Sequence, residues 1–355
     1  QTPNPKPQTP NPLKRSLSEI KRKISVKAEV DSIMEDSEKY EMQKFLGNGC
    51  FGSVFLAEKR NPESSKVEKF AVKRIEKVGS VLSREYEILK ELQNTRHSVQ
   101  MTDCFFTKNE NGKLVQNIVL EYLTSSLEAF IKELHNKRSA LPEDEIRMTM
   151  FQVFTGLAEI HAKGIVHRDL KPENVLMDRS RVVKICDFGS SKFIDKGGRN
   201  TPYIVSRFYR APELFMCYTN YNGAIDIWAA GCMLAEMFTG SPIFQGDTEG
   251  EQLFAIMRLW GSLSEEQSRF FVQKVPFFSS FIARFPKYSK DKEAIARMFG
   301  HVRNRRGLLS LLDAIFEYNP NKRLTAEEVL RHPFFEGVER QYQEFYRRLK
   351  DARQD

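Results

Sequence analysis

The glycine-rich stretch LGNGCFGSV (46–54) holds the first residues whose types and spacing suit the binding of phosphate. Gly47, Gly49, Gly52 and Val54 fit the pattern G-x-G-x-x-G-x-V. Glycines between two strands let backbone N–H groups come close to a polyphosphate. A dinucleotide-binding loop is disfavoured, because a strand pattern rather than a helix follows the glycines and no acidic residue ends a second strand. A plain glycine hairpin remains the alternative for this motif alone.

Two charged residues downstream strengthen the phosphate interpretation. FAVK (70–73) puts Lys73 on the next strand, where its ammonium group can contact phosphate oxygens. Glu85 lies on the following helical stretch and can hold that lysine in place through an ion pair. A lone lysine or glutamate is normally a surface charge. It is the combination with the glycines that indicates a nucleotide site.

Three further motifs follow in a fixed order along the chain. They are HRDLKPEN (167–174), DFG (187–189) and APE (211–213). Together with the glycines, the lysine and the glutamate, this ordered set resembles the eukaryotic protein kinases. The resemblance covers roughly residues 40–335, and chance agreement of so many ordered elements is negligible.

The hydrophobic pattern predicts the elements that must position these motifs. From Tyr40 the chain alternates like β-strands, and 81–93 has apolar residues at helical spacing. A further strand is expected at 114–123, and a long helix at 143–164 that ends with a capping glycine, Gly164. A β-rich region with one helix therefore precedes a mainly helical region.

The expected fold class is α+β, with the bilobal architecture that the kinase resemblance implies. The small β-rich lobe with one helix is placed at 36–122 and the larger, mainly helical lobe at 123–335. Residues 1–35 read as a disordered basic tail rich in Pro and Ser, and 336–355 as a charged C-terminal helix.

Bulk properties narrow the class of protein and its partners. The net charge is +8, of which residues 1–30 hold +5, and a basic tail on a nearly balanced body is only a weak signal for nucleic acid. Nucleic acid is therefore not an expected partner. The longest apolar run, 227–235, is too short to span a bilayer, so no membrane is expected. Five widely spaced cysteines without a C-x-x-C pair signal neither zinc nor a disulfide framework. Cytoplasmic residence, with nuclear access as an extension, is the default expectation.

The kinase resemblance implies roles for the residues of these motifs. Asp169 would accept or orient the proton of the substrate hydroxyl, and Lys171 would face the transferring phosphate. Lys73, held by Glu85, would contact the phosphates of ATP. The cofactors would be ATP and Mg²⁺, a hard ion held by the side-chain oxygens of the metal ligands, Asn174 and Asp187. The residues expected around ATP are Leu46, Gly47, Gly49, Gly52, Val54, Ala71, Lys73, Leu120, Glu121, Leu123 and Leu176.

Other polar residues in the motifs read as architectural. His167 is interpreted as a packing residue rather than a base or a metal ligand. The resemblance implies that Asp226 hydrogen-bonds the backbone of the catalytic loop, and that Arg323 pairs with Glu213 of APE.

The sequence SRFYRAPEL (206–214) resembles the CMGC group of serine/threonine kinases, and three details favour the glycogen synthase kinase 3 family. DFGSSK is close to that family's DFGSAK, and YIVSRFYRAPEL is close to its YICSRYYRAPEL. SPIFQGDTEGEQL (241–253) resembles its QPIFPGDSGVDQL. By contrast, 262–306 bears little likeness to the family's scaffold-docking region, so scaffold binding is not carried over.

In that family three basic side chains bind a phosphate already present on the substrate. The matching residues are Arg84, Arg168 and Lys192, all basic in this chain. The resemblance thus implies protein substrates that are already phosphorylated, with Ser or Thr four residues before the priming phosphate. Such a phosphate could gain several charge-assisted hydrogen bonds, each worth roughly 1.5–3 kcal/mol before desolvation.

Two hydroxyls keep alternatives open. Tyr203 matches the family's activation-segment phosphotyrosine, whereas Thr201 matches the T-x-Y pattern of mitogen-activated kinases. In those kinases the same three basic positions bind the chain's own phosphothreonine. For Thr201 itself, an unmodified polar residue of the loop is the leading interpretation. A pseudokinase that acts as a scaffold is disfavoured, because no catalytic group is missing.

Overall fold

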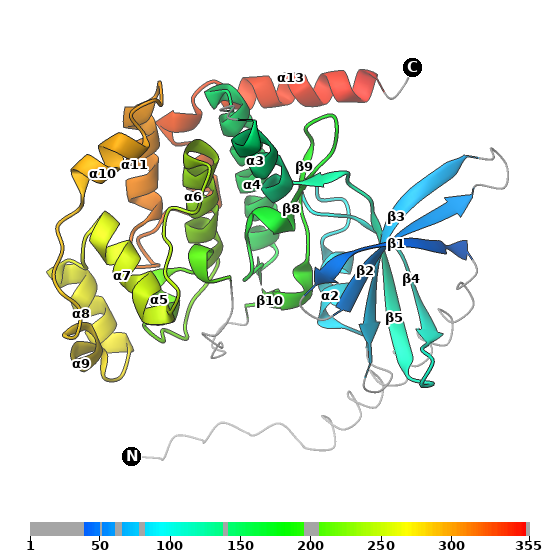
Figure 1. The fold of residues 1–355 in the computed structure, drawn as a ribbon, viewed down its shortest axis with the longest axis horizontal. Coiled ribbons are helices and arrows are strands. Elements are labelled where there is room, and N and C mark those ends of the chain that lie inside the picture. The colour runs from blue at the N-terminus through cyan, green and yellow to red at the C-terminus, as the bar shows by residue number, and fades with distance from the viewer. Residues whose placement is uncertain are drawn as a thin grey trace, which may run out of the picture. The chain divides into compact units, whose positions relative to one another are not determined.

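The computed structural model describes residues 39–49, 52–60, 66–77, 82–137, 141–194 and 206–352. These residues form two units, one of 39–90 with 101–122 and one of 91–100 with 123–352. The predicted tail at 1–35 and the two activation-segment hydroxyls, Thr201 and Tyr203, lie outside the described residues. Figure 1 shows the elements of each unit.

The first unit is built on a five-stranded antiparallel sheet. Its strands pair in the order β1-β2-β3-β5-β4, so that β1 and β4 are the edges. Helix α2 spans Arg84–Glu91, inside the stretch 81–93 that the sequence predicts as helical. The strands are β1 Glu41–Gly49, β2 Gly52–Arg60, β3 Val67–Glu76, β4 Met101–Lys108 and β5 Leu114–Glu121.

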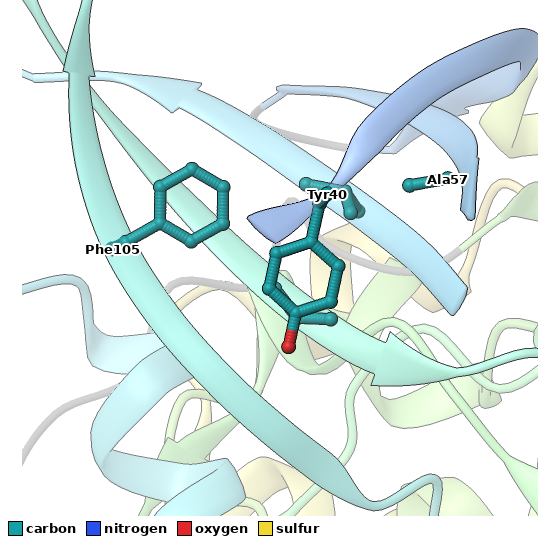
Figure 2. Close-up of a cluster of buried hydrophobic side chains, with 5 residues drawn as sticks. Tyr40, Ala57 and Phe105 are labelled. Atoms are coloured by element: carbon teal, nitrogen blue, oxygen red, sulfur yellow. The ribbon is translucent and has the colours of Figure 1, made fainter. Parts of the chain in front are cut away.

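One face of this sheet carries a cluster of buried side chains around Tyr40 (Figure 2). The Tyr40 ring stacks on Phe105 with centroids 5.7 Å apart, and its hydroxyl donates to Asp103 Oδ2 at 3.0 Å. Val72 of β3 lies in the cluster. Because side chains alternate along a strand, the next residue, Lys73, points to the opposite face. The cluster therefore packs against one face of β3, and Lys73 extends from the opposite face of the sheet.

The second unit is mainly helical, and helix α6 (Ala224–Thr239) is its core. Every residue from Ile225 to Met237 is buried, as expected for a helix that is apolar on all sides. A Cβ at Gly231 would lie 2.4 Å from Ile315, so a glycine is required where α6 meets α11. The other helices are α3 Leu127–Asn136, α4 Glu143–Ala162, α5 Pro212–Phe215, α7 Glu249–Trp260, α8 Glu265–Lys274, α9 Phe278–Ile282, α10 Lys292–Met298, α11 Arg305–Ile315, α12 Ala326–Leu330 and α13 Val338–Asp351.

Short strands and turns of this unit hold the sequence motifs. Strand β7 (Ile165–Val166) pairs with β10 (Lys192–Phe193). Strands β6 (Ser125–Ser126), β8 (Val175–Met177) and β9 (Val183–Ile185) form a second small sheet. HRDLKPEN lies between β7 and β8, and DFG lies between β9 and β10.

The α+β class and the kinase architecture of a five-stranded sheet followed by a helical region are confirmed. Within the described ranges, no helix is both long enough and apolar enough to cross a membrane. The segment 91–100 groups with the second unit, whereas the sequence boundaries assign it to the first lobe. The reason is its backbone bonding to β9, where Val99 N donates to Ile185 O at 2.9 Å.

Candidate active site

In the first unit, Lys73 and Glu85 form a buried ion pair. Lys73 Nζ lies 2.7 Å from Glu85 Oε1, and the two residues are 2% and 3% exposed. Strand β3 supplies the lysine and helix α2 supplies the carboxylate. Removing one member of such a pair leaves an uncompensated buried charge, so each residue holds the other in place.

The glycine-rich hairpin joins β1 to β2 in the same unit, with Gly47 opposite Val54 and Gly49 opposite Gly52. A Cβ at Gly52 in β2 would lie 2.2 Å from the carbonyl oxygen of Arg74 in β3. Only glycine fits at position 52 without a shift of one of these strands. A Cβ at Gly47 would meet nothing within 4 Å. Gly52 is therefore needed for packing, whereas Gly47 is not required by packing around its Cβ position.

Several residues predicted to surround adenine lie on one face of the sheet. Val54 pairs with Lys73, and Ala71 pairs with Leu120, so these four side chains share the face that carries the ion pair. Glu121 ends β5, and Leu46 in β1 is 41% exposed. Leu123 and Leu176 belong to the second unit.

In the second unit, Asp226 of α6 fixes the backbone of the HRD segment. Its carboxylate accepts hydrogen bonds from His167 N and Arg168 N, each at 2.9 Å, and from His161 Nε2 at 2.9 Å. Burial alone would raise the pKa of Asp226, but the hydrogen bonds from His161 and the Arg168 amide outweigh it, so the pKa lies below the usual 3.8. These bonds hold Arg168 at φ 69°, a conformation that non-glycine residues rarely adopt.

Asp169 lies at the centre of a small polar network. Its Oδ1 accepts from the amide and hydroxyl of Ser206 at 3.0 and 3.1 Å, and its Oδ2 lies 3.3 Å from Lys171 Nζ. Lys171 Nζ also donates to the Ser206 hydroxyl at 3.1 Å. Ser206 thus joins the two residues predicted to be catalytic. Sequence reasoning missed this role, although Ser206 opens the SRFYRAPEL motif.

The two predicted metal ligands are brought together by the backbone. Cys186 N donates to Asn174 O at 2.9 Å, and Cys186 directly precedes Asp187. Asn174 Nδ2 donates to Asp169 O at 2.7 Å, which leaves its amide oxygen to bind a cation. Asp187 adopts a left-handed conformation with φ 60°, a strained backbone of the kind found at functional sites.

This donor set fits Mg²⁺. Carboxylate and amide oxygens are hard ligands, and Mg²⁺ usually takes one or two of them together with water and substrate phosphate. Across the described ranges, no group of three or more His, Cys, Asp or Glu side chains forms a metal cage. The pair Asn174 and Asp187 therefore suits a metal that arrives with a nucleotide.

His167 packs beneath this network. It is fully buried, its ring contacts Phe188 of DFG edge-on, and its Nε2 donates to Cys186 O at 2.9 Å. Its Nδ1 is then the acceptor for the Asp169 amide at 3.3 Å. Both ring nitrogens bond to the backbone, which agrees with the packing role expected for this residue.

A family model described as protein kinase domain matches residues 40–335. This chain belongs to the protein kinase domain family. It is accordingly a phosphotransferase that uses ATP and acts on protein substrates. The matched region includes both the ion pair of the first unit and the Asp169 network of the second.

The kinase anchors its APE motif through a buried ion pair. Arg323 donates to both carboxylate oxygens of Glu213, at 2.7 and 2.9 Å, and both side chains are fully buried. Arg323 also donates to Glu317 O and stacks over Trp228. This pairing, which the resemblance implied, ties the end of the activation segment to the core of the second unit.

The three basic residues expected to bind phosphate belong to different elements of the kinase. Arg84 is exposed at the start of α2 in the first unit. Arg168 donates through Nε to Ser190 O at 2.7 Å and through Nη1 to the Tyr221 hydroxyl at 3.2 Å. Lys192 pairs through its backbone with Val166, two residues before Arg168. The structure thus brings Arg168 and Lys192 to neighbouring segments, and it adds Tyr221, which sequence reasoning missed.

Proposed function

We propose that this kinase transfers the γ-phosphate of ATP to serine or threonine of proteins, and that it prefers substrates already phosphorylated four residues towards the C-terminus. The observation that carries the transfer reaction is the network of Asp169, Lys171 and Ser206. The specificity rests on the resemblance of SRFYRAPEL and DFGSSK to the glycogen synthase kinase 3 family of the CMGC group.

In the proposed reaction, the substrate hydroxyl oxygen attacks the γ-phosphorus as the bond to the leaving ADP breaks. Ser206 orients the Asp169 carboxylate by two hydrogen bonds to Oδ1. The other oxygen, Oδ2, which also lies 3.3 Å from Asn174 Nδ2, is the one proposed to take the hydroxyl proton. Lys171, 3.3 Å from Oδ2, stabilises negative charge on the transferring group. Positioning and charge stabilisation of this kind account for most of the catalysis in phosphoryl transfer.

The residues proposed to bind the nucleotide are those expected from the kinase resemblance. Lys73, kept in place by Glu85, would contact phosphate oxygens, and backbone N–H groups of the glycine-rich hairpin would bind them as well. Asn174 and Asp187 would hold Mg²⁺, which would neutralise charge on the phosphates. The residues that would contact the adenine are Leu46, Val54, Ala71, Leu120, Leu123 and Leu176, and Glu121 would offer backbone groups to it.

The proposed priming-phosphate pocket uses Arg84, Arg168 and Lys192. Support comes from the identity of these residues and from the neighbouring segments that carry Arg168 and Lys192. Its three cations would more than offset the negative charge of a phosphoserine, which can accept several charge-assisted hydrogen bonds.

A mitogen-activated type of kinase is the second candidate. The spacing of Thr201 and Tyr203 favours it. In such a kinase, a phosphate on Thr201 of the same chain would bind the three basic residues in place of a substrate phosphate. Phosphotyrosine at position 203 belongs to both proposals.

The experiment that tests the transfer reaction uses MgATP and a degenerate peptide mixture containing Ser, Thr and Tyr. We expect phosphoserine and phosphothreonine as products, and no product from Asp187→Ala or Asp169→Asn. Equal labelling of tyrosine would reject the specificity. If Asp169→Asn transferred phosphate at the wild-type rate, the assignment of Asp169 as the base would be rejected.

A further inference from the structure

Helix α13 (Val338–Asp351) lies outside the region that the kinase family model matches, yet it is docked on the second unit (Figure 1). The side chains of Val338 and Tyr342 are buried, and most others on the helix are charged or polar. The Tyr342 ring packs against Phe151 of α4, with centroids 5.3 Å apart. The phenol hydroxyl of Tyr342 forms a hydrogen bond with a buried histidine.

That histidine is His97, in the segment that follows α2. It is fully buried, with Nδ1 2.7 Å from Val183 O and Nε2 2.8 Å from the Tyr342 hydroxyl. A carbonyl oxygen can only accept, so Nδ1 carries the proton and Nε2 accepts from the tyrosine. Arg96 Nη1 donates to the same hydroxyl oxygen at 3.1 Å. Burial lowers the pKa of His97 to about 4, which agrees with a neutral ring in this single tautomer.

His97 is also bonded to strand β9 through its backbone. Ile185 N donates to His97 O at 2.7 Å, and Val99 N donates to Ile185 O at 2.9 Å. Both the ring and the main chain of His97 therefore hold β9 (Val183–Ile185). The next residues after this strand are Cys186 and Asp187, the proposed metal ligand.

The approach of this segment to α4 depends on a glycine. A Cβ at Gly156 would lie 2.8 Å from the Cβ of His97, so a larger residue on α4 would push the segment away. Glu159 of the same helix accepts from Arg96 N at 3.1 Å. The segment 91–100, which continues directly from α2, is thus held by α4, β9 and α13 at once.

We propose that Tyr342 is a positioning residue for the kinase reaction, which acts through His97 and β9 to place Asp187. Loss of the hydroxyl leaves Nε2 without a donor, and the ring can recover a bond only by changing tautomer or orientation. Either change removes the donor from Val183 O and loosens the strand before Asp187. The inference rests on the proposed role of Asp187 as a metal ligand.

The test compares Tyr342→Phe with Tyr318→Phe in the full chain. Tyr318 is a matched control, because its buried hydroxyl also donates one hydrogen bond, to Gly261 O at 2.6 Å. For Tyr342→Phe we expect the free Mg²⁺ needed for half-maximal transfer to rise about tenfold, with the peptide KM unchanged, since a buried acceptor without a donor is costly. Tyr318→Phe should leave the Mg²⁺ dependence as in the wild type.

Amide hydrogen exchange on the nucleotide-free protein supplies a readout independent of activity. In Tyr342→Phe the amides of Ile185 and Val99 should exchange at least about tenfold faster, while amides of α11 keep their rates. Faster exchange throughout the second unit would mean that Tyr342 only stabilises the fold. Faster exchange confined to β9 with an unchanged Mg²⁺ dependence would overturn the link to Asp187.

A second variant keeps the proposal testable if Tyr342→Phe is unstable. In His97→Asn the amide nitrogen stands near the position of Nδ1 and can donate to Val183 O without help from Tyr342. We therefore expect near-normal Mg²⁺ dependence in His97→Asn, and no further effect when Tyr342→Phe is added. An equal effect of Tyr342→Phe in both backgrounds would contradict action through the histidine.

Discussion

Asp226 accepts hydrogen bonds from both backbone amides that precede Asp169, those of His167 and Arg168, at 2.9 Å each. One buried carboxylate on the central helix thereby sets the path of the loop that carries the proposed base. The same carboxylate is bonded to His161 of α4, so the loop is held between the two longest buried helices of the second unit.

Substitution of Asp226 by Asn tests this relationship. The amide can accept from only one side, so one loop amide loses its partner, at about 1–3 kcal/mol. We expect kcat to fall by about 10- to 100-fold with a smaller change in the KM for ATP, measured by steady-state phosphate transfer. A wild-type kcat would show that the loop keeps its path without these bonds.

Asp226 also predicts a pH dependence of stability. Its pKa in the folded protein lies below the usual 3.8, so the folded state favours the charged form. The contribution to the free energy of unfolding is present above pH 3.8 and is lost as the pH falls through the lower folded value. Denaturant titrations of wild type and Asp226→Asn should converge at low pH, whereas a constant difference down to the acid limit would contradict the assignment.

The ion pair of Lys73 and Glu85 predicts that stability and activity can be separated. Lys73→Met removes the cation that lies 2.7 Å from the buried Glu85 carboxylate, and it should cost about 3–5 kcal/mol of stability as well as nearly all activity. The double variant Lys73→Met/Glu85→Leu should regain most of the stability but none of the activity. Thermal unfolding and phosphate transfer measure the two effects.

Lys69→Met is the control for that series, because Lys69 lies on the same strand with its side chain 55% exposed and only a 3.8 Å contact to Glu58. It should change neither stability nor transfer. Activity in the double variant would mean that Lys73 serves the structure alone.

Glu236 predicts a second, opposite pH effect. Burial raises the pKa of this carboxyl to about 7, and the nearby carboxylates of Glu173 and Glu128 add to the rise against a hydrogen bond from Tyr209. The folded state therefore holds a proton that the unfolded state releases near pH 4.5, so the free energy of unfolding should fall between pH 4.5 and about 7. Glu236→Gln should remove that part of the slope in denaturant titrations; an unchanged slope would exclude Glu236 as its source.

The two glycines of the hairpin predict a contrast. Gly52→Ala should destabilise the first unit by about 1–3 kcal/mol, because its Cβ would lie 2.2 Å from the Arg74 carbonyl oxygen and β2 must shift. Gly47→Ala should leave the melting temperature unchanged, since nothing lies within 4 Å of the added carbon. Equal melting temperatures for both variants would contradict the packing role of Gly52.

The loop that carries the proposed base was predictable because its motif is contiguous in sequence. Asp169, Lys171 and Asn174 share one loop. The pattern at 143–164 predicts helix α4, whose observed C-cap is Lys163, followed by Gly164 with a positive φ of 68°. Strand β4 was not predicted. It is an edge strand with only Cys104, Phe105 and Phe106 buried, so it lacks a clear alternation.

Contacts between distant residues could not be predicted from the sequence. The bond from Ser206 to Asp169 joins residues 37 positions apart, and the bond from His97 to Tyr342 spans 245 positions. Neither has a local signal, because each depends on how the helices pack. The grouping of 91–100 with the second unit has the same origin.

We propose that this kinase binds a phosphate already present on its substrate through Arg84, Arg168 and Lys192. The most direct measurement compares transfer from MgATP to one peptide in two forms, S-x-x-x-S and S-x-x-x-phosphoserine. Wild type, Lys192→Ala and the exposed-lysine control Lys322→Ala are assayed together. We predict at least about a tenfold preference for the primed peptide in wild type and in Lys322→Ala, and its loss in Lys192→Ala with transfer to the unprimed form intact. Equal transfer to both peptides by the wild-type kinase would contradict the claim.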